Sequence, residues 1–599
     1  MTVINRTVIK AKAGMPEPGK QLASLTQTEL SVQGISYDVP SKRIGNSLKR
    51  ILDNVTVRIR PSEFVGVIGA NGSGKSTLIK VLAGRTLPSE GSVLLNGKNL
   101  HANFESLKQY IAFMPQRDVL HEQLTLRQAL GYVAQLRLPP HTTAAECREA
   151  VYEAARNVEL LKCLDQRIGS LSGGQRKCAG LASEILNRPS LLFLDEVTSG
   201  LDENTDWEIM RLLRRLSDGG MTIVLITHTL TSVAAFCDKV LCMGGNGQPT
   251  FFGTPAEALD FFTMHRLGEI FSRIDEFGVK HWRANFEKAT GTIADLPVAV
   301  ESDCNLRRSD TRQRRRPPLA ALARSVRQGR ILLHRNILLL LSDRRTLAMA
   351  AVQSVLIGGL VGYAFGQFGT GQEMVSAKSA LLLLLSLSAI WLGCNAASKE
   401  IVGDLMIYRH EHYINLSTAA FVIAKYLVSA AFTVLQLAIV FVLVAALAES
   451  IPGPPLEQFL LLATGALAGA AIGLLISASA NTRDQATTIV PLALVPQLLL
   501  SGVLVPKLPH LAESVAKIAV SGYWLTEAMK SVFIAAEGPI RVVKGDTGMV
   551  INMTGEPAGL SAVILAAHAL AFLLLAYLVT RLRHGGRKRS NWDSSGLDS

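Results

Sequence analysis

The sequence has few cysteines, few aromatic residues and few charges for its length, and these shortages exclude several classes of protein. Only 7 of its 599 residues are cysteines, and none has the spacing of metal ligands. We therefore expect reduced thiols rather than a metal centre or a disulfide framework. The first residues, Met1 to Gln21, are polar and contain no apolar core. No secretory signal is expected there, so any membrane entry must come from internal segments.

Charged residues make up 18% of the chain, hydrophobic residues make up 48%, and the two are unevenly distributed. Charges crowd the first 345 residues, and Leu, Ala, Val and Ile dominate the rest. The formal net charge of +13 owes much to a run from Arg307 to Arg316, which has no interleaved aromatics and lies just before the apolar half. This placement favours a membrane protein with basic cytoplasmic edges over a nucleic-acid binder. The length requires at least two domains.

A phosphate-binding loop is the most specific feature of the first half. Residues Gly69 to Ser76 read Gly-Ala-Asn-Gly-Ser-Gly-Lys-Ser, after the apolar run Val65 to Ile68 and before a predicted helix, Ser76 to Leu82. Glycines let backbone N–H groups approach phosphates, and the helix N-terminus favours anions. The spacing disfavours a plain Gly-rich turn. The expected nucleotide contacts are Gly69, Asn71, Gly72, Ser73, Gly74, Lys75, Ser76 and Thr77.

Within this loop, Lys75 should neutralise the β- and γ-phosphates and Ser76 should ligate Mg²⁺. Farther along, Leu191 to Leu194 reads as a buried strand that ends in Asp195 and Glu196. An acid at the carboxyl end of a parallel strand points into the ligand crevice. Asp195 therefore fits a Mg²⁺ partner and Glu196 a general base for the attacking water. Helix-capping acids are the alternative, but that interpretation ignores the strand.

Two weaker signals lie around these motifs. Ser172, Gly173 and Gly174 stand at the start of a predicted helix, Arg176 to Leu186, and form a second anion-binding nest. A second nest makes sense if it completes a site in a partner chain. His228 follows another strand-like run and fits a γ-phosphate contact, although a lone His is usually structural.

Together these segments resemble the nucleotide-binding domain of ATP-binding-cassette (ABC) transporters. The matching elements occur in order: the phosphate loop, Gln116, the Leu-Ser-Gly-Gly-Gln signature, the Asp195-Glu196 strand end, the loop ending in Asp202, and His228. The segments QRDVLHEQLTLRQAL, LSGGQRK and TSGLD further resemble the G-type, or White, half-transporters. The resemblance covers most of Leu30 to Thr580 and is looser in the apolar half.

The resemblance implies roles for several residues. Ser172 and Gly174 would contact the γ-phosphate bound by a partner chain, and Asp202 would bridge the two nucleotide domains. Gln116 would contact Mg²⁺ or water and report to the membrane half. Tyr37 is the candidate for stacking on adenine, with strand packing as an equal alternative. ATP and Mg²⁺ are the implied cofactors.

The apolar half contains six stretches long enough to cross a bilayer as helices, which takes about 20 residues. The predicted spans are 346–366, 380–397, 419–446, 459–480, 487–506 and 559–579. Six spans return the chain to the side on which they began, and basic residues before the first span and after the last predict cytoplasmic N- and C-termini. Gly465, Gly469 and Gly473 recur every four residues, which favours close helix packing.

Two polar stretches and a few isolated polar residues interrupt this half. Leu319 to Leu341 reads as an amphipathic helix at the cytoplasmic interface. By resemblance, the loop Lys399 to Asn415 would carry a coupling helix. The polar residues inside spans could line a substrate path or join helices, and both interpretations stay open. These residues are Gln353, Asn395, Gln436 and Gln497.

The expected fold is an α/β P-loop nucleotide-binding domain of the ABC ATPase type followed by an all-α six-helix transmembrane domain. The expected divisions are a tail at 1–29, the nucleotide-binding domain at 30–265, a linker and connecting helix at 266–345, the transmembrane domain at 346–580 and a basic cytoplasmic tail at 581–599. The chain is expected to be an integral protein of the cell or plasma membrane.

The expected function is ATP-driven transport, with export of a hydrophobic or amphipathic molecule inferred from the resemblance alone. One chain has one phosphate loop and one signature nest, so two complete ATP sites need a dimer. A homodimer is expected, and a heterodimer with another half-transporter stays open. The other expected partners are membrane lipids and a small amphipathic substrate, with no nucleic acid. The alternative is a membrane ABC ATPase that regulates a partner without transport.

Overall fold

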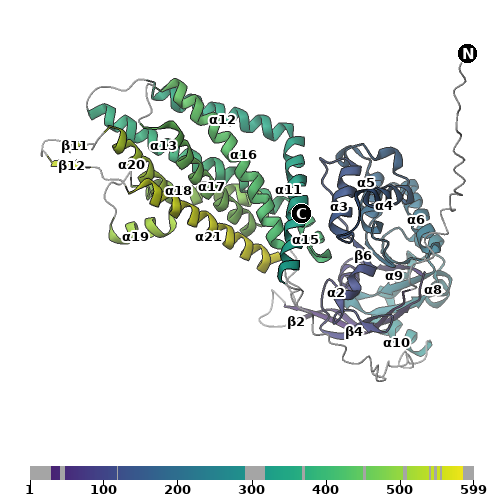
Figure 1. Ribbon diagram of the computed structural model, residues 1–599. Helices are drawn as coiled ribbons and strands as arrows, with labels where there is room; N and C mark the ends of the chain where they lie inside the picture. Colours follow the sequence, from purple (N-terminus) through teal and green to yellow (C-terminus); the bar gives the residue numbers. More distant parts are fainter. Residues whose placement is uncertain are drawn as a thin grey trace, which may run out of the picture. The chain divides into compact units, whose positions relative to one another are not determined.

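The computed structural model describes residues 28–40, 48–117, 119–289, 318–366, 372–448, 453–502, 509–537, 541–544, 549–552 and 556–584. The polar start and the Arg307 to Arg316 run lie outside these residues. Contacts divide the chain into two units, with the main division between Ser309 and Asp310. We describe each unit by itself (Figure 1).

A six-stranded sheet organises the first unit, in the order β10-β9-β3-β8-β7-β6. Strands β3, β6, β7, β8 and β9 run parallel, and β10 pairs antiparallel with β9. Parallel strands covered on both faces need continuous apolar runs, which explains the completely buried strands β7 and β8. The strands are β3 Phe64–Gly69, β6 Ile111–Met114, β7 Leu191–Asp195, β8 Thr222–Ile226, β9 Lys239–Met243 and β10 Pro249–Gly253.

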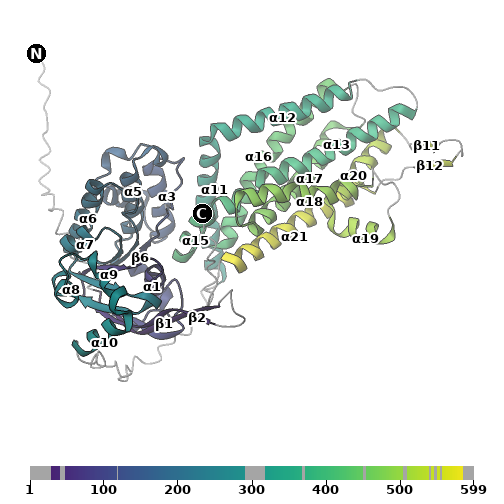
Figure 2. The same cartoon turned by 180° about the vertical axis from the view of Figure 1, so that it is seen from behind.

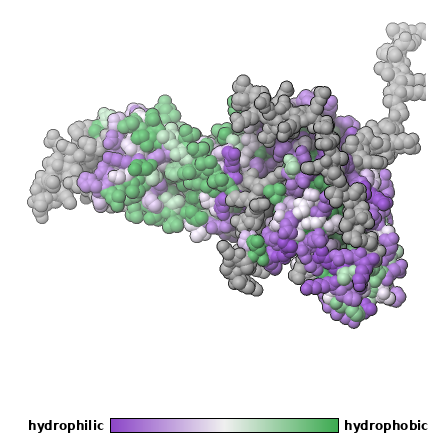
Figure 3. Space-filling view, turned by 90° about the horizontal axis from the view of Figure 1, so that it is seen from below, coloured by the Kyte–Doolittle hydropathy of each residue, from purple (hydrophilic) through white to green (hydrophobic). Residues whose placement is uncertain are grey.

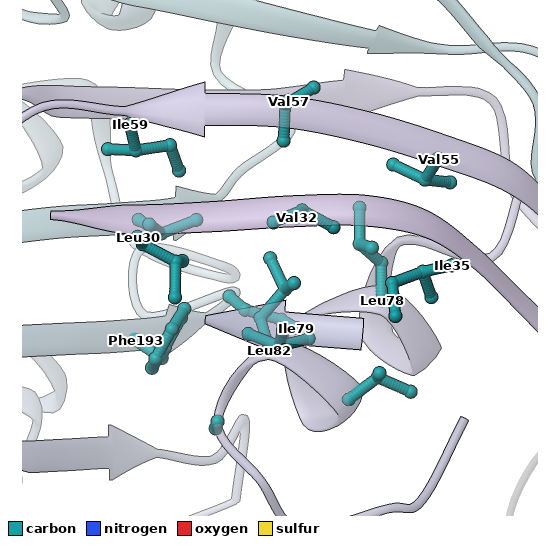
Figure 4. Packing of buried hydrophobic residues seen from close by; sticks show 14 of the residues in the cluster. Leu30, Val32, Ile35, Val55, Val57, Ile59, Leu78, Ile79, Leu82 and Phe193 are labelled. Atoms are coloured by element: carbon teal, nitrogen blue, oxygen red, sulfur yellow. The ribbon is translucent and has the colours of Figure 1, made fainter. Parts of the chain in front are cut away.

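A second, antiparallel sheet has the order β2-β1-β4-β5. Its strands are β1 Leu30–Pro40, β2 Leu48–Ile59, β4 Glu90–Leu95 and β5 Lys98–Asn99. Figure 4 shows how its side chains interlock with those of helix α1 and with Phe193 of β7 to form the core of this unit. The first helix after β3 is therefore fixed between the two sheets, which positions the phosphate loop that joins β3 to α1.

Helices complete the first unit, and several of them begin at a capping side chain. Thr125, Thr143, Ser172 and Thr254 each form a capping box with the residue three positions on, which satisfies free N–H groups of the first turn. The helices are α1 Lys75–Leu82, α2 Phe104–Leu107, α3 Leu126–Arg137, α4 Ala144–Asn157, α5 Gly173–Ile185, α6 Glu203–Asp218, α7 Leu230–Phe236, α8 Pro255–Phe262, α9 Glu269–Phe277 and α10 Val279–Ala289.

The second unit is built of helices that pack side by side, as Figures 1 and 2 show from opposite directions. Helix α11 crosses the ends of the longest ones in both views. The elements are α11 Pro318–Ser342, α12 Arg344–Ala364, α13 Gln372–Ala397, α14 Glu400–Gly403, α15 Leu405–Ile414, α16 Thr418–Leu447, α17 Pro455–Ser479, α18 Arg483–Leu499, α19 His510–Ala519, α20 Ser521–Glu537, the strands β11 Arg541–Lys544 and β12 Met549–Asn552, and α21 Ala558–His584.

Five helices of the described residues are long and apolar enough to cross a membrane by length and composition. They cover Arg344–Ala364, Ala380–Gly403, Thr418–Leu447, Pro455–Ser479 and Ala558–Arg583, and they match five of the six predicted spans. Figure 3 shows apolar side chains over the face of this unit that is turned to the viewer. Such a surface suits lipid better than water.

The remaining predicted span, 487–506, differs from the structure. Its helix, α18, has 17 residues and stops at Leu499. Gly502 then adopts a left-handed conformation with φ 75°. The helix also begins at the charged pair Arg483 and Asp484, and Pro491 and Pro496 lie inside it. The apolar composition that suggested one long span therefore belongs partly to a helix and partly to the turn that ends it.

The glycines of α17 bring helices into backbone contact, as their spacing predicts. A Cβ added to Gly469 would lie 2.3 Å from the carbonyl oxygen of Ile390, and one added to Gly473 would lie 2.4 Å from that of Cys394. Both partners belong to α13. Because backbone cannot move aside as a flexible side chain can, these positions require glycine.

Buried ion pairs join the polar segments of the second unit. The ammonium of Lys425, on α16, lies 2.9 Å from a carboxylate oxygen of Glu400 and 2.6 Å from one of Asp404. Arg335 of α11 binds both carboxylate oxygens of Glu411 on α15. The predicted amphipathic helix is thus fixed to the segment 399–415, which the structure shows as two short helices rather than a loop.

Candidate functional site

The phosphate loop joins β3 to α1 through two glycines that need positive φ. Gly72 has φ 80° and Gly74 has φ 85°, a conformation that residues with a Cβ adopt with strain. No side chain caps the first turn of α1 at Gly74. The N–H groups of that turn are therefore available to an anion, and the helix dipole favours one there.

Lys75 lies over the loop and is buried. Its ammonium donates to the carbonyl oxygens of Gly69 at 2.8 Å and Ala70 at 2.9 Å. Burial lowers the pKa of Lys75 because removal from water disfavours the charged form, which Glu196 and Asp195 partly offset. The buried hydroxyl of Ser73 has no hydrogen-bond partner among the described residues. A cation and an unpaired donor beside open amides fit a polyphosphate.

Asp195 and Ser76 provide oxygen ligands suited to a cation. The hydroxyl of Ser76 donates to a carboxylate oxygen of Asp195 at 3.0 Å. Burial raises the pKa of Asp195, and nearby lysines only partly counteract this. A hydroxyl and a carboxylate at this distance are the donor set that Mg²⁺ accepts together with phosphate oxygens. The two residues therefore fit the metal that a nucleotide would bring.

Glu196 directly follows Asp195, and its carboxylate contacts two side chains. One of its carboxylate oxygens accepts from the Gln116 side-chain amide at 2.7 Å, and the other lies 2.9 Å from Nε2 of His228. Its backbone has φ 53°, the left-handed region that costs energy for a residue with a side chain. Strain of this kind is concentrated at functional sites.

The parallel sheet explains why these residues meet. Gly69, Gln116, Asp195 and His228 lie at or just beyond the carboxyl ends of β3, β6, β7 and β8, which are neighbours in the sheet. The carboxyl ends of parallel strands share one edge, where open α/β sheets bind ligands. Residues that are up to 159 positions apart in sequence, such as Gly69 and His228, are brought to one edge by this topology.

Ser172, Gly173 and Gly174 form a second group at the start of α5. The hydroxyl of Ser172 accepts from the N–H of Gln175, whose side chain accepts from the N–H of Ser172. A Cβ added to Gly174 would lie 2.4 Å from a methyl carbon of Thr205. Glycine is therefore required where α5 meets α6.

Asp202 belongs to this second group. It caps α6 by accepting from the N–H and the hydroxyl of Thr205, and these hydrogen bonds lower the pKa of Asp202. Thr205 therefore contacts both the nest and Asp202. Sequence reasoning did not single it out, although an Asp three residues before a Thr at a helix start is a recognisable capping signal.

Lys177 also escaped sequence reasoning. Its ammonium donates to the backbone carbonyl oxygen of Gln116 at 2.7 Å. A lysine on a helix carries no signal of such a contact, because its acceptor is a backbone atom 61 positions away.

Tyr37 packs in the core of the first unit. It is 8% exposed, belongs to the cluster around Val32, Leu52 and Leu78, and faces Leu52 across the β1–β2 pair. Burial raises the pKa of its hydroxyl. This position favours strand packing over adenine stacking, the two interpretations that the sequence left open.

Two family models match the chain in the order of its two units. The ABC transporter model matches residues 52–199, and the ABC-2 type transporter model matches residues 327–533. The chain belongs to the ABC transporter family. The resemblance found in the motifs is confirmed, as is the fold class of a P-loop ATPase domain followed by a helical membrane domain. The first unit is therefore an ATP-binding domain.

Known proteins of two organisms are similar to long parts of this chain. The chain is 32% identical over 526 residues to an ABC transporter ATP-binding/permease protein of Mycobacterium tuberculosis, covering 84% of this chain and 58% of that protein. It is 34% identical over 300 residues to ABC transporter G family member 22 of Arabidopsis thaliana, covering 49% of this chain and 39% of that protein. The chain thus spans less than two thirds of the length of these relatives.

Among solved structures, the ATP-binding subunit of an ABC transporter is 26% identical, with a TM-score of 0.36, and the match covers 42% of this chain and 100% of that one.

Proposed function

We propose that this chain is an ATP-driven membrane transporter that exports a hydrophobic or amphipathic molecule and hydrolyses ATP at composite sites in a dimer. The observation that carries the proposal is the carboxylate of Glu196, held between Gln116 and His228 beside the phosphate loop. A carboxylate fixed at this place suits the abstraction of a proton from water that attacks the terminal phosphate.

Each residue then has a defined task. Lys75 and the amides of the first turn of α1 bind and orient the β- and γ-phosphates. Ser76 and Asp195 hold Mg²⁺, which would supply charge neutralisation of the phosphate oxygens. Glu196 takes the proton of the attacking water, while Gln116 orients that water and His228 donates to the γ-phosphate. The positive φ of Glu196 fixes the direction of its side chain.

The dimer follows from what a single chain contains. It has one phosphate loop and one nest of the Ser172-Gly174 type, and Ser172 and Gly173 of the nest are exposed at a capped helix N-terminus. Two chains facing head to tail about a two-fold axis would place the nest of each chain against the nucleotide of the other. Asp202, in contact with Thr205 behind the nest, would lie at the same interface.

The second unit supplies the membrane path. Five helices suited to a bilayer pack around a core with few charges, and ATP-driven closure of the nucleotide domains would be transmitted to them. The segment 399–415 is the proposed receiver of that motion, because ion pairs fix it to α11 and α16.

The test uses the full chain purified and reconstituted in liposomes containing a fluorescent amphiphile. We expect Mg²⁺-dependent ATP hydrolysis together with movement of the amphiphile across the bilayer, and loss of both in Lys75→Ala. Hydrolysis that is stimulated by amphiphiles without any movement across the bilayer would favour a regulatory membrane ATPase. Unchanged ATP binding and hydrolysis in Lys75→Ala would contradict the assignment of the phosphate loop.

A further inference from the structure

Gln116 connects two parts of the first unit that belong to different functional groups. Its side-chain amide donates to Glu196 at 2.7 Å, and its backbone carbonyl oxygen accepts from the ammonium of Lys177 at 2.7 Å. Lys177 lies on α5, the helix that begins with the nest at Ser172. One residue thus links the helix of the nest to the carboxylate proposed as the base.

Helix α5 carries both the nest and Lys177. Its first turn is closed by the reciprocal capping box of Ser172 and Gln175. Lys177 follows Gly174 by three residues, which is about one helical turn. Farther along, a Cβ added to Gly180 would lie 2.8 Å from the terminal methyl of Met114 at the end of β6. The nest and Lys177 therefore lie on one helix, which packs closely against the end of β6, two residues before Gln116.

We propose that Lys177 is a positioning residue through which the two nucleotide sites of a dimer influence each other. The proposal rests on the head-to-tail dimer proposed above. In that dimer the nest of a chain belongs to its partner's site, whereas Gln116 and Glu196 of the same chain belong to its own site. Nucleotide bound against the nest shifts α5, and Lys177 transmits this shift to the backbone of Gln116 and thereby to Glu196.

Coupling of this kind requires two arrangements of α5 that differ in how Gln116 contacts Glu196. With Lys177 bonded to its carbonyl, Gln116 holds Glu196 in the position seen here. When α5 moves, the same bond draws Gln116 along and changes how its amide meets Glu196. Coupling between sites in proteins is about 5- to 150-fold in affinity. For two identical sites, fivefold coupling corresponds to a Hill coefficient of about 1.4.

The experiment measures ATP hydrolysis against ATP concentration for the full chain in lipid. Three variants are compared with the parent: Lys177→Met removes the donor, Lys177→Arg retains a cation able to donate, and Lys162→Met alters an exposed lysine elsewhere on the same unit. We expect a Hill coefficient clearly above 1 in the parent, a value near 1 in Lys177→Met, and cooperativity retained in Lys177→Arg and Lys162→Met. Lys177→Leu, which also lacks a donor, replaces Lys177→Met if that variant does not fold.

A purely structural role for Lys177 would lower stability or the maximal rate without changing the Hill coefficient. A Hill coefficient in Lys177→Met equal to that of the parent overturns the proposal, and so does a parent that hydrolyses ATP without cooperativity. Both results leave the ATPase assignment intact. A parent with no hydrolysis at all instead contradicts the proposed function.

Discussion

In each unit of this chain a charged side chain lies between two partners, Glu196 in the first unit and Lys425 in the second. The two arrangements differ in exposure and in charge. In the nucleotide-binding unit, Glu196 lies between Gln116 and His228, and the Glu196 side chain is 17% exposed. In the membrane unit, Lys425 is 5% exposed and lies between Glu400 and Asp404. Lys425 is almost completely buried and depends on its carboxylate partners, because a buried charge without a partner is costly.

The difference shows two uses of charge. At the edge of the sheet, a partly exposed carboxylate has an amide and an imidazole as its partners. Within the helical unit, opposite charges are matched at short distance so that the elements 399–415 and α16 keep a fixed geometry. The following predictions test this contrast.

The largest effect is expected at Glu196. Glu196→Gln retains the shape of the side chain but removes the base, so ATP hydrolysis should fall by about 100- to 10,000-fold. ATP binding should persist, because the phosphate loop is unchanged. Steady-state hydrolysis and equilibrium nucleotide binding measure the two quantities. Glu208→Gln, an exposed acid on α6, is the matched control. Turnover close to that of the parent in Glu196→Gln would remove the assignment of this residue as base.

Removal of the buried cation in the membrane unit should affect stability rather than nucleotide binding. Lys425→Met leaves Asp404, which is 15% exposed, and the more exposed Glu400 without their partner, which should cost about 3 kcal/mol of unfolding free energy. Lys517→Met is the control, because its pair with Glu513 is about 40% exposed on both sides, and exposed ion pairs contribute little to stability. Thermal unfolding in detergent compares them. Equal losses in both variants would show that burial does not distinguish these pairs.

Helix packing in the membrane unit should be sensitive to a single methyl group. Gly469→Ala places a carbon against the backbone of α13 and should cost about 1–3 kcal/mol. Gly359→Ala, on α12, meets no atom within 4 Å and should be close to neutral. The yield of monodisperse protein and its thermal midpoint provide the measurement. If Gly469→Ala behaves like Gly359→Ala, the close contact of α13 and α17 is not required.

The smallest effect on binding is expected at Tyr37. As a core residue, it should tolerate Tyr37→Phe, while Tyr37→Leu should lower the stability of the nucleotide-binding unit. ATP affinity should remain within about twofold in both, because neither substitution alters the phosphate loop. A stacked ring would contribute about 0.5–1.5 kcal/mol, so a loss of affinity of threefold or more in Tyr37→Leu alone would restore the adenine-stacking interpretation. Equilibrium binding of ATP to each folded variant decides between the two.

How much of the motifs and of the topology could be predicted from the sequence differs between the two units. Gly72 and Gly74 could be placed because only glycine adopts their backbone conformation readily, and Asp195 and Glu196 because an apolar run ends in them. In the apolar half, the spacing of Gly465, Gly469 and Gly473 predicted helix packing correctly. The end of α18 at Leu499 could not be predicted, because the residues that follow are as apolar as those before it.

The sequence by itself determined which residues are the candidates for nucleotide chemistry, since phosphate binding needs glycines, a lysine and a hydroxyl at fixed spacing along one turn of chain. It also determined that the second half is helical and apolar. Only the tertiary structure decided which distant side chains meet. The order of strands β3, β8, β7 and β6 brings Gln116 and His228 to Glu196, and the packing of α5 brings Lys177 to Gln116. The reason is that hydrogen bonds between distant residues depend on the positions of whole elements, which local residue patterns do not specify.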